Sequence, residues 1–202
     1  MSDAQPARHK LHWLPNALTV SRIVMIPVLV WQFLAPVDAI SPDVMSMGGA
    51  IVFLVFAFCM FTDWLDGFLA RKWKVVSPFG RMLDPIADKL LVASCLICIC
   101  ILNAGAFIFV LPAFVIIGRD IFVSGIREHA ANAGIVLSPT KLAKWKTAFE
   151  MLAILLYILS HVVPRAHYEA INTASIALLW LAAILSAYTG FHYFRSAMRK
   201  PG

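Results

Sequence analysis

Long apolar runs, separated by short charged patches, alternate along the whole chain. Six of these runs approach the roughly 20 residues that a helix needs to cross a bilayer. They cover residues 15–36, 48–71, 84–103, 106–128, 145–164 and 169–195. The pattern predicts an all-α fold, a multi-pass membrane protein built as a bundle of six transmembrane helices. We expect a single domain over residues 1–202, in which residues 1–14 form a juxtamembrane N-terminal segment.

The boundary between the third and fourth predicted helices rests on turn-forming residues. Residues 90–118 contain no charged side chain, so charge alone does not divide this stretch. Asn103, Gly105 and Pro112 interrupt it, which predicts two helices joined by a tight turn. With about 1.5 Å of rise per residue, the third helix can span a bilayer only if it begins near Asp84. Because Pro85 follows directly, we expect Asp84 to be the N-cap of that helix.

Composition and charge support a membrane location. Hydrophobic residues make up 61% of the chain and charged residues only 14%, which differs from the usual balance of a soluble domain. Under the predicted topology nearly all Lys and Arg residues fall on one side of the membrane, and Arg165 is the exception. Since cytoplasmic loops collect basic residues, both termini are predicted to be cytoplasmic. The net charge of +6 suits anionic lipids and anionic substrates, and no motif indicates nucleic-acid binding.

The segment FTDWLDGFLARKWKVVSPFGRMLDPIADKL, residues 61–90, carries four aspartates beside apolar runs. An acidic side chain inside a membrane helix costs roughly 2.5–3.5 kcal/mol on insertion scales, so four of them indicate a function. Asp63 and Asp66 share one helix face, and Asp84 and Asp88 share another. Carboxylate oxygens suit Mg²⁺ or Mn²⁺, and a pair of such ions can stabilise a phosphoryl transfer. The sequence therefore predicts a site for two divalent cations.

Neighbouring residues in this segment fit a phosphate-containing ligand. Gly67 and Gly80 lack side chains beside the carboxylates, so a nucleotide can approach the backbone closely. Arg71 offers bidentate contacts to a phosphate. Each feature alone has a simpler explanation, such as helix packing for Gly67. A divalent-cation transporter would also place carboxylates in membrane helices, but Arg71 would repel a permeating cation.

The spacing of these residues, Asp-x-x-Asp-Gly-x-x-Ala-Arg, then eight residues, then Gly-x-x-x-Asp-x-x-x-Asp, resembles the signature of the CDP-alcohol phosphatidyltransferases. Every fixed position matches: Asp63, Asp66, Gly67, Ala70, Arg71, Gly80, Asp84 and Asp88. The resemblance implies a membrane enzyme that uses two divalent ions to move a phosphatidyl group from CDP-diacylglycerol to an alcohol, with release of CMP. It also implies a homodimer. The distribution of basic residues places the acidic segment, and with it the active site, at the cytoplasmic face of the cell (inner) membrane.

The resemblance implies a role for each residue of the signature. The four aspartates would bind the metal ions, and Asp88 would also act as the base that deprotonates the acceptor hydroxyl. The CDP group would be held by Gly67, Arg71, Ser77 and Gly80.

Two further stretches bear on the acceptor alcohol. PNALTVSRIVMIP, residues 15–27, resembles the opening shared by phosphatidylglycerophosphate synthases and cardiolipin synthases, and it supplies Asn16, Thr19 and Arg22 as further candidate site residues. GRDIFVSGIREHAANAG and KLAKWKT, residues 118–134 and 141–147, are more similar to the phosphatidylglycerophosphate synthases. The resemblance therefore favours sn-glycerol 3-phosphate as the acceptor. Phosphatidylglycerol, the acceptor of a cardiolipin synthase, remains the alternative.

Basic residues near the ends of the fourth and fifth predicted helices provide a physical reason for that acceptor. We expect Arg119, Arg127 and Lys144 to bind the acceptor phosphate, and Lys146 to assist, because glycerol 3-phosphate is a dianion. Arg119 and Arg127 each precede an acid, so an ion pair with that neighbour can orient them. Lys146 could equally serve only to fix the topology. Glu150, an acid inside a predicted helix, has no assigned role.

Overall fold

The computed structural model describes residues 14–35, 47–73, 78–132, 134 and 141–198, and these residues form six α-helices. The helices are α1 (Leu14–Leu34), α2 (Met47–Trp73), α3 (Pro78–Leu102), α4 (Phe107–Asn132), α5 (Lys141–Ser160) and α6 (Arg165–Met198). The predicted all-α fold and the number of helices are confirmed for this part of the chain. The juxtamembrane segment expected before the first helix lies outside the described residues, except for Leu14.

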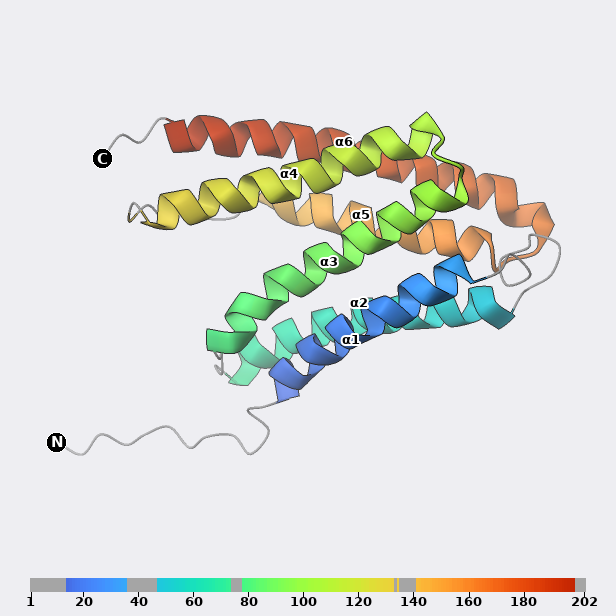
Figure 1. Ribbon diagram of the computed structural model, residues 1–202, viewed down its shortest axis with the longest axis horizontal. Coiled ribbons are helices and arrows are strands. Elements are labelled where there is room, and N and C mark those ends of the chain that lie inside the picture. Colours follow the sequence, from blue (N-terminus) through green and yellow to red (C-terminus); the bar gives the residue numbers. More distant parts are fainter. Residues whose placement is uncertain (1–13, 36–46, 74–77, 133, 135–140, 199–202) are drawn as a thin grey trace.

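Successive helices run in alternating directions (Figure 1). The first residues of α1, α3 and α5 therefore lie at the same end of the bundle as the last residues of α2, α4 and α6, on the left in Figure 1. Helix α1 packs against α2 and α3, whereas α6 packs against α4 and α5. The polar residues near these helix ends are consequently gathered at one end of the molecule.

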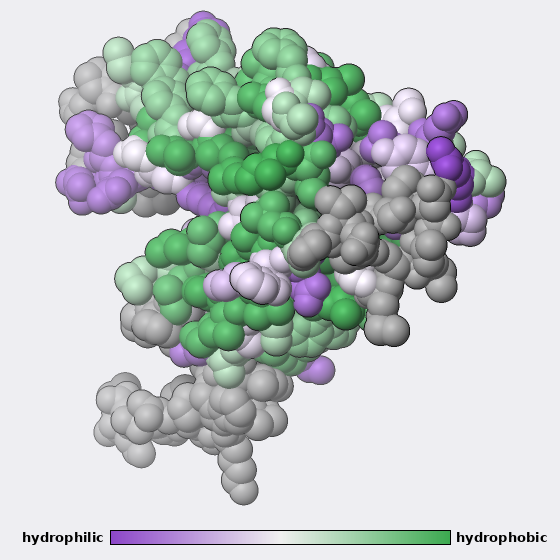
Figure 2. All heavy atoms as spheres, turned by 45° about the vertical axis from the view of Figure 1, so that its right-hand side comes forward, coloured by the Kyte–Doolittle hydropathy of each residue, from purple (hydrophilic) through white to green (hydrophobic). Residues whose placement is uncertain are grey.

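Five helices, all except α5, contain stretches long and apolar enough to cross a membrane. Figure 2 shows apolar residues over much of one face, with hydrophilic groups towards its margins. Helix α5 does not reach this level of apolarity, because its first ten residues carry four charged side chains: Lys141, Lys144, Lys146 and Glu150. These findings support a membrane protein, while the sixth span and the cytoplasmic location of the termini stay predictions.

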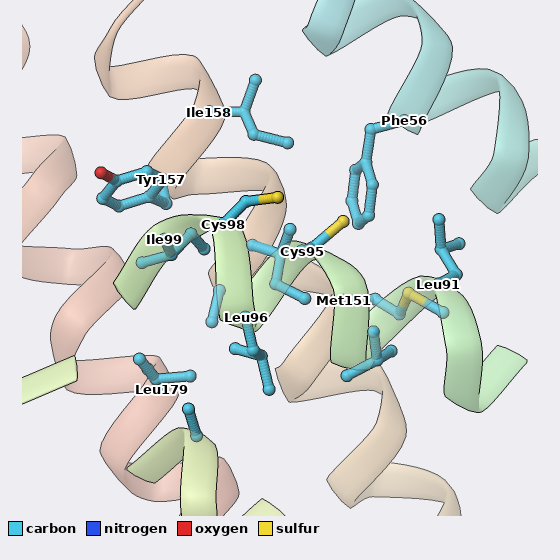
Figure 3. Close-up of a cluster of buried hydrophobic side chains, with 14 of the residues drawn as sticks. Phe56, Leu91, Cys95, Leu96, Cys98, Ile99, Met151, Tyr157, Ile158 and Leu179 are labelled. Carbon is cyan, nitrogen blue, oxygen red and sulfur yellow. The ribbon is translucent and has the colours of Figure 1, made fainter. Parts of the chain in front are cut away.

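Helix α3 lies at the centre of the apolar core. Leu91, Cys95 and Leu96 of α3 are at most 1% exposed. Figure 3 shows them among side chains from three other helices, including Phe56 of α2 and Met151 of α5. The four cysteines are free thiols, and three of them are buried in this core as apolar packing residues.

The start of α3 differs from the prediction. The helix begins at Pro78, so Asp84 and Pro85 lie inside it, and the predicted N-cap role of Asp84 is wrong. A proline is well tolerated at the first helical position, and Pro78 fills that position about two turns before Pro85. As a result, the Asp84 side chain does not cap its own helix and can contact a different one.

The predicted turn between the third and fourth helices is confirmed at residues 103–106. Ala104 and Gly105 have φ angles of 50° and 69°, in the left-handed region that reverses the chain tightly. The side-chain Nδ2 atom of Asn103 donates to the Ile99 carbonyl oxygen at 2.8 Å and to the Tyr157 hydroxyl at 2.7 Å. The turn is therefore fixed both by its backbone and by a contact to α5.

Two Gly→Ala substitutions are expected to change stability in opposite directions. A Cβ atom at Gly105 or at Gly118 would meet no other atom within 4 Å, so only the backbone conformation differs. Gly105→Ala should lower the free energy of unfolding by about 1–2 kcal/mol, because φ is positive there. Gly118→Ala, inside α4, should raise it by about 0.5–1 kcal/mol. Reversible unfolding in detergent measures both, and equal shifts would contradict the assigned turn.

Candidate active site

A single buried arginine joins three of the four signature aspartates. The Arg22 side chain of α1 is 0% exposed, and its guanidinium lies 3.1 Å from Asp63 Oδ1, 2.6 Å from Asp66 Oδ2 and 2.8 Å from Asp88 Oδ1. Asp63 and Asp66 come from α2 and Asp88 from α3. Because α1 packs against both helices, its guanidinium can contact carboxylates from both at once.

The fourth aspartate contacts the same face of α1. Thr19, one turn before Arg22, donates its hydroxyl hydrogen to Asp84 Oδ1 at 2.6 Å. Asn16 lies a further turn towards the N-terminus of α1 and is partly buried. Three of the four carboxylates thus meet at Arg22, and the fourth contacts α1 one turn away. Two candidate residues from the N-terminal stretch, Thr19 and Arg22, are in direct contact with these aspartates.

The charge and chemistry of this cluster fit divalent cations. Four carboxylates and one guanidinium leave a formal excess of three negative charges at a partly buried place, and such an excess is costly without further cations. The atoms that could bind a metal ion here are carboxylate oxygens, which Mg²⁺ and Mn²⁺ prefer. In the described part of the chain no three His, Cys, Asp or Glu side chains are arranged to hold one ion. Arg22 contacts the oxygens that the ions would use, so ions and guanidinium would compete for them.

The residues expected to bind CDP are described only in part. Gly67 follows Asp66 on α2 and is half-buried, and Gly80 is buried in the first turn of α3. Arg71 belongs to the last turn of α2, but its side chain, like the whole of Ser77, lies outside the described residues. Contacts to CDP stay a prediction for all four.

A pocket of about 480 Å³ lies next to the carboxylate cluster, between α3, α4 and α5. Its basic lining residues are Lys89, Arg119, Arg127, Lys144 and Lys146, and its acidic ones are Asp88, Asp120 and Glu150. The structure thus brings together the predicted phosphate-binding residues and places them beside Asp88, the predicted base. Asp88 belongs to both the carboxylate cluster and this cationic pocket.

Asp120 organises two of the basic residues in the cationic pocket. Its Oδ1 atom accepts from Arg119 at 3.0 Å and from Lys146 Nζ at 2.6 Å. Lys146 is only 2% exposed and makes a second ion pair, at 2.7 Å, with Glu150 one turn later. The expected pairing of Arg119 with its neighbour is confirmed, and Glu150, which had no assigned role, holds Lys146 in place.

Arg127 does not use its acidic neighbour in the same way. Its guanidinium donates to the hydroxyl of Tyr193 on α6 at 2.8 Å, and among the described residues it forms no ion pair with Glu128. This contact between α4 and α6 was not predicted from the sequence. The sequence pattern that could have indicated it is a set of small and polar residues inside an apolar helix, spaced so that they share one face of α6.

The chain belongs to the CDP-alcohol phosphatidyltransferase family, whose sequence pattern matches residues 12–188. Members of this family generally use divalent metal ions. The chain is 36% identical to a CDP-diacylglycerol–glycerol-3-phosphate 3-phosphatidyltransferase of Rickettsia bellii, over 92% of the chain and 96% of that protein. A protein of the same name from Haemophilus influenzae is 36% identical over 91% of the chain and 92% of its own length.

A relative with a different acceptor is equally similar. The chain is 35% identical over 96% of its length to a cardiolipin synthase (CMP-forming) of Oryza sativa subsp. japonica, and it spans only 60% of that longer protein. Family membership therefore establishes a phosphatidyltransferase, whereas similarity alone does not choose between the two acceptors.

Arg22→Gln should destabilise the protein strongly. The substitution leaves three carboxylates together without their buried positive charge, a change that typically costs about 3–5 kcal/mol in the free energy of unfolding. The measurement is unfolding in detergent with a chelator present, so that bound cations cannot compensate. Arg195→Gln, an exposed position on α6, is the control and should change the value by less than about 0.5 kcal/mol. Similar small losses for both variants would contradict the role of Arg22.

Proposed function

We propose that the protein transfers a phosphatidyl group from CDP-diacylglycerol to sn-glycerol 3-phosphate, giving phosphatidylglycerol phosphate and CMP. Family membership supports the transfer, and the names of the bacterial relatives support both substrates. The family also removes the support for a divalent-cation transporter. We place the reaction at the cytoplasmic face of the cell (inner) membrane and expect a homodimer, as the resemblance implied.

The cationic pocket is the observation that carries the choice of acceptor. Among the described residues its lining has five basic and three acidic side chains, a formal excess of two positive charges. A phosphate monoester carries a charge of about −1.5 to −2 at pH 7, whereas the phosphodiester of phosphatidylglycerol carries about −1. The small dianion therefore matches the charge of the pocket better than the lipid does.

The geometry suggests how the residues act. The acceptor phosphate would lie on Arg119, Arg127 and Lys144, and its glycerol hydroxyl would lie beside Asp88, which lines the same pocket. Asp88 would take the proton of that hydroxyl while the hydroxyl oxygen attacks the phosphorus bonded to diacylglycerol. The bond from that phosphorus to the oxygen of CMP breaks, and CMP leaves with the electron pair.

The remaining signature residues would prepare the donor. Asp63, Asp66, Asp84 and Asp88 would hold two divalent cations, which when bound stabilise negative charge on the phosphates. Thr19 and Arg22 would keep the four carboxylates on one side of α1 before the cations bind. The CDP group would lie along Gly67 and Gly80, with Arg71 and Ser77 beside it.

An acceptor comparison tests the proposed function directly. Purified protein with CDP-diacylglycerol and Mg²⁺ or Mn²⁺ should release CMP rapidly with glycerol 3-phosphate and form phosphatidylglycerol phosphate. Glycerol should be a poor acceptor because it lacks the phosphate that the basic side chains of the pocket would bind. A chelator of divalent metal ions should stop the reaction. If phosphatidylglycerol were the better acceptor and cardiolipin the product, the function of the rice relative would replace the one proposed.

Asp88→Asn should reduce kcat by about 100-fold or more, because the amide cannot accept the proton of the acceptor hydroxyl. Glu169→Gln removes one exposed carboxylate of α6, far along the chain from the site, and serves as the control. Initial rates of CMP release, measured on protein that elutes as the wild type does, give the comparison. Retention of more than a tenth of the wild-type rate by Asp88→Asn would exclude Asp88 as the base.

A further inference from the structure

One face of α6 carries four residues that lie behind the cationic pocket without lining it. Ser186, Thr189, Gly190 and Tyr193 follow the spacing i, i+3, i+4 and i+7, so they share one side of the helix. All four are buried. Hydroxyl groups are costly to bury in an apolar helix unless they are hydrogen-bonded, so their partners show what this face does. We call these four residues the backing face.

Thr189 and Gly190 fix Arg119. The Arg119 guanidinium donates to Thr189 Oγ1 at 3.1 Å, and Thr189 in turn donates to the Ser186 carbonyl oxygen. A Cβ atom at Gly190 would lie 3.0 Å from Arg119 Cγ, closer than side chains normally pack. The absence of a side chain at Gly190 therefore allows the Arg119 stem to lie against α6.

Tyr193 fixes Arg127 and also contacts Arg119. Its hydroxyl accepts from Arg127 at 2.8 Å. The ring centroid lies 5.0 Å from Arg127 Cζ and 5.7 Å from Arg119 Cζ, within the range of cation–π interactions. One buried ring thus lies beneath two of the guanidinium groups in the cationic pocket.

Ser186 acts on the third basic residue through an acid. Its hydroxyl donates to Glu150 Oε1 at 3.2 Å, and the same oxygen lies 2.7 Å from Lys146 Nζ. Lys146 is thereby held between Glu150 and Asp120. Three of the five basic residues that line the pocket are therefore held, directly or through one acid, by the backing face.

From these contacts we propose that the backing face of α6 determines how well the pocket binds an anionic acceptor. Its residues are positioning residues, since they contact basic side chains or Glu150 and do not line the pocket. An unrestrained arginine loses side-chain entropy when an anion fixes it, and a side chain that is already held binds the anion with less of that loss. This inference rests on the proposed function, because it assumes that the pocket binds the phosphate of glycerol 3-phosphate.

The test compares KM for each substrate in matched pairs of variants. Tyr193→Phe removes the hydroxyl that Arg127 uses, and its control is Tyr188→Phe, 57% exposed on the same helix. Gly190→Ala forces Arg119 to move, and its control is Gly118→Ala, where the added methyl group meets nothing within 4 Å. We expect each of the first variants to raise KM for glycerol 3-phosphate roughly three- to tenfold, the effect of about one hydrogen bond. KM for CDP-diacylglycerol should stay unchanged, and both controls should resemble the wild type.

A third pair separates positioning from folding. Thr189→Val keeps the shape of the side chain but removes the hydroxyl, and Thr189→Ser restores it. The Val variant should show the raised KM for glycerol 3-phosphate and the Ser variant should recover most of the wild-type value. A purely structural role would instead lower stability and reduce the amount of active enzyme, without a selective change in one KM.

The outcomes distinguish this inference from the proposed function. If the wild type does not use glycerol 3-phosphate, the proposed function fails and the inference fails with it. If the wild type uses it, but the folded Tyr193→Phe, Gly190→Ala and Thr189→Val variants change both KM values equally or neither, the inference is overturned while the proposed function stands. A selective rise in KM for glycerol 3-phosphate supports both.

Discussion

The contact between the buried Arg22 guanidinium and three carboxylates sets the arrangement of the first three helices. A fully buried charge is strongly destabilising unless partners lie close, and here the partners are Asp63 and Asp66 of α2 and Asp88 of α3. Helix α1 must therefore lie where it can contact both other helices. Neither the arginine nor the carboxylates could be buried there alone. The guanidinium offsets one of these negative charges and so lowers the cost of gathering the aspartates beside an apolar core.

The acidic cluster and most basic residues of the cationic pocket come from different helices, although Asp120 and Glu150 lie among those basic residues. Helices α2 and α3 supply the acidic cluster, whereas α4 and α5 supply most of the cations and α6 supports them from behind. The two sets meet at Asp88. An acceptor bound between them would have its anionic group on the basic side and its nucleophile on the acidic side. Under the proposed function, this arrangement would let one pocket both attract a phosphate and activate a hydroxyl.

Features that depend on local pattern could be predicted from the sequence, and those that depend on helix packing could not. The apolar runs located six helices, and the turn residues located the break after Leu102. The predicted N-cap role of Asp84 rested on Pro85 and was wrong, because the helix already begins at another proline, Pro78. The contacts of Arg22 and Tyr193 join residues 41 to 74 positions apart. Such contacts follow from how the helices pack, which spacing along a single helix does not encode.

The most direct test of this account measures how strongly enzyme-bound Mn²⁺ relaxes the ³¹P nucleus of glycerol 3-phosphate. Paramagnetic relaxation falls steeply with distance, so it reports whether the acceptor phosphate lies near the aspartate cluster. The account predicts strong relaxation that excess Mg²⁺ reverses and that Arg127→Ala weakens at the same ligand concentration. Relaxation no greater than that caused by free Mn²⁺, although the ion is bound to the protein, would show that acceptor and carboxylates do not meet at this pocket.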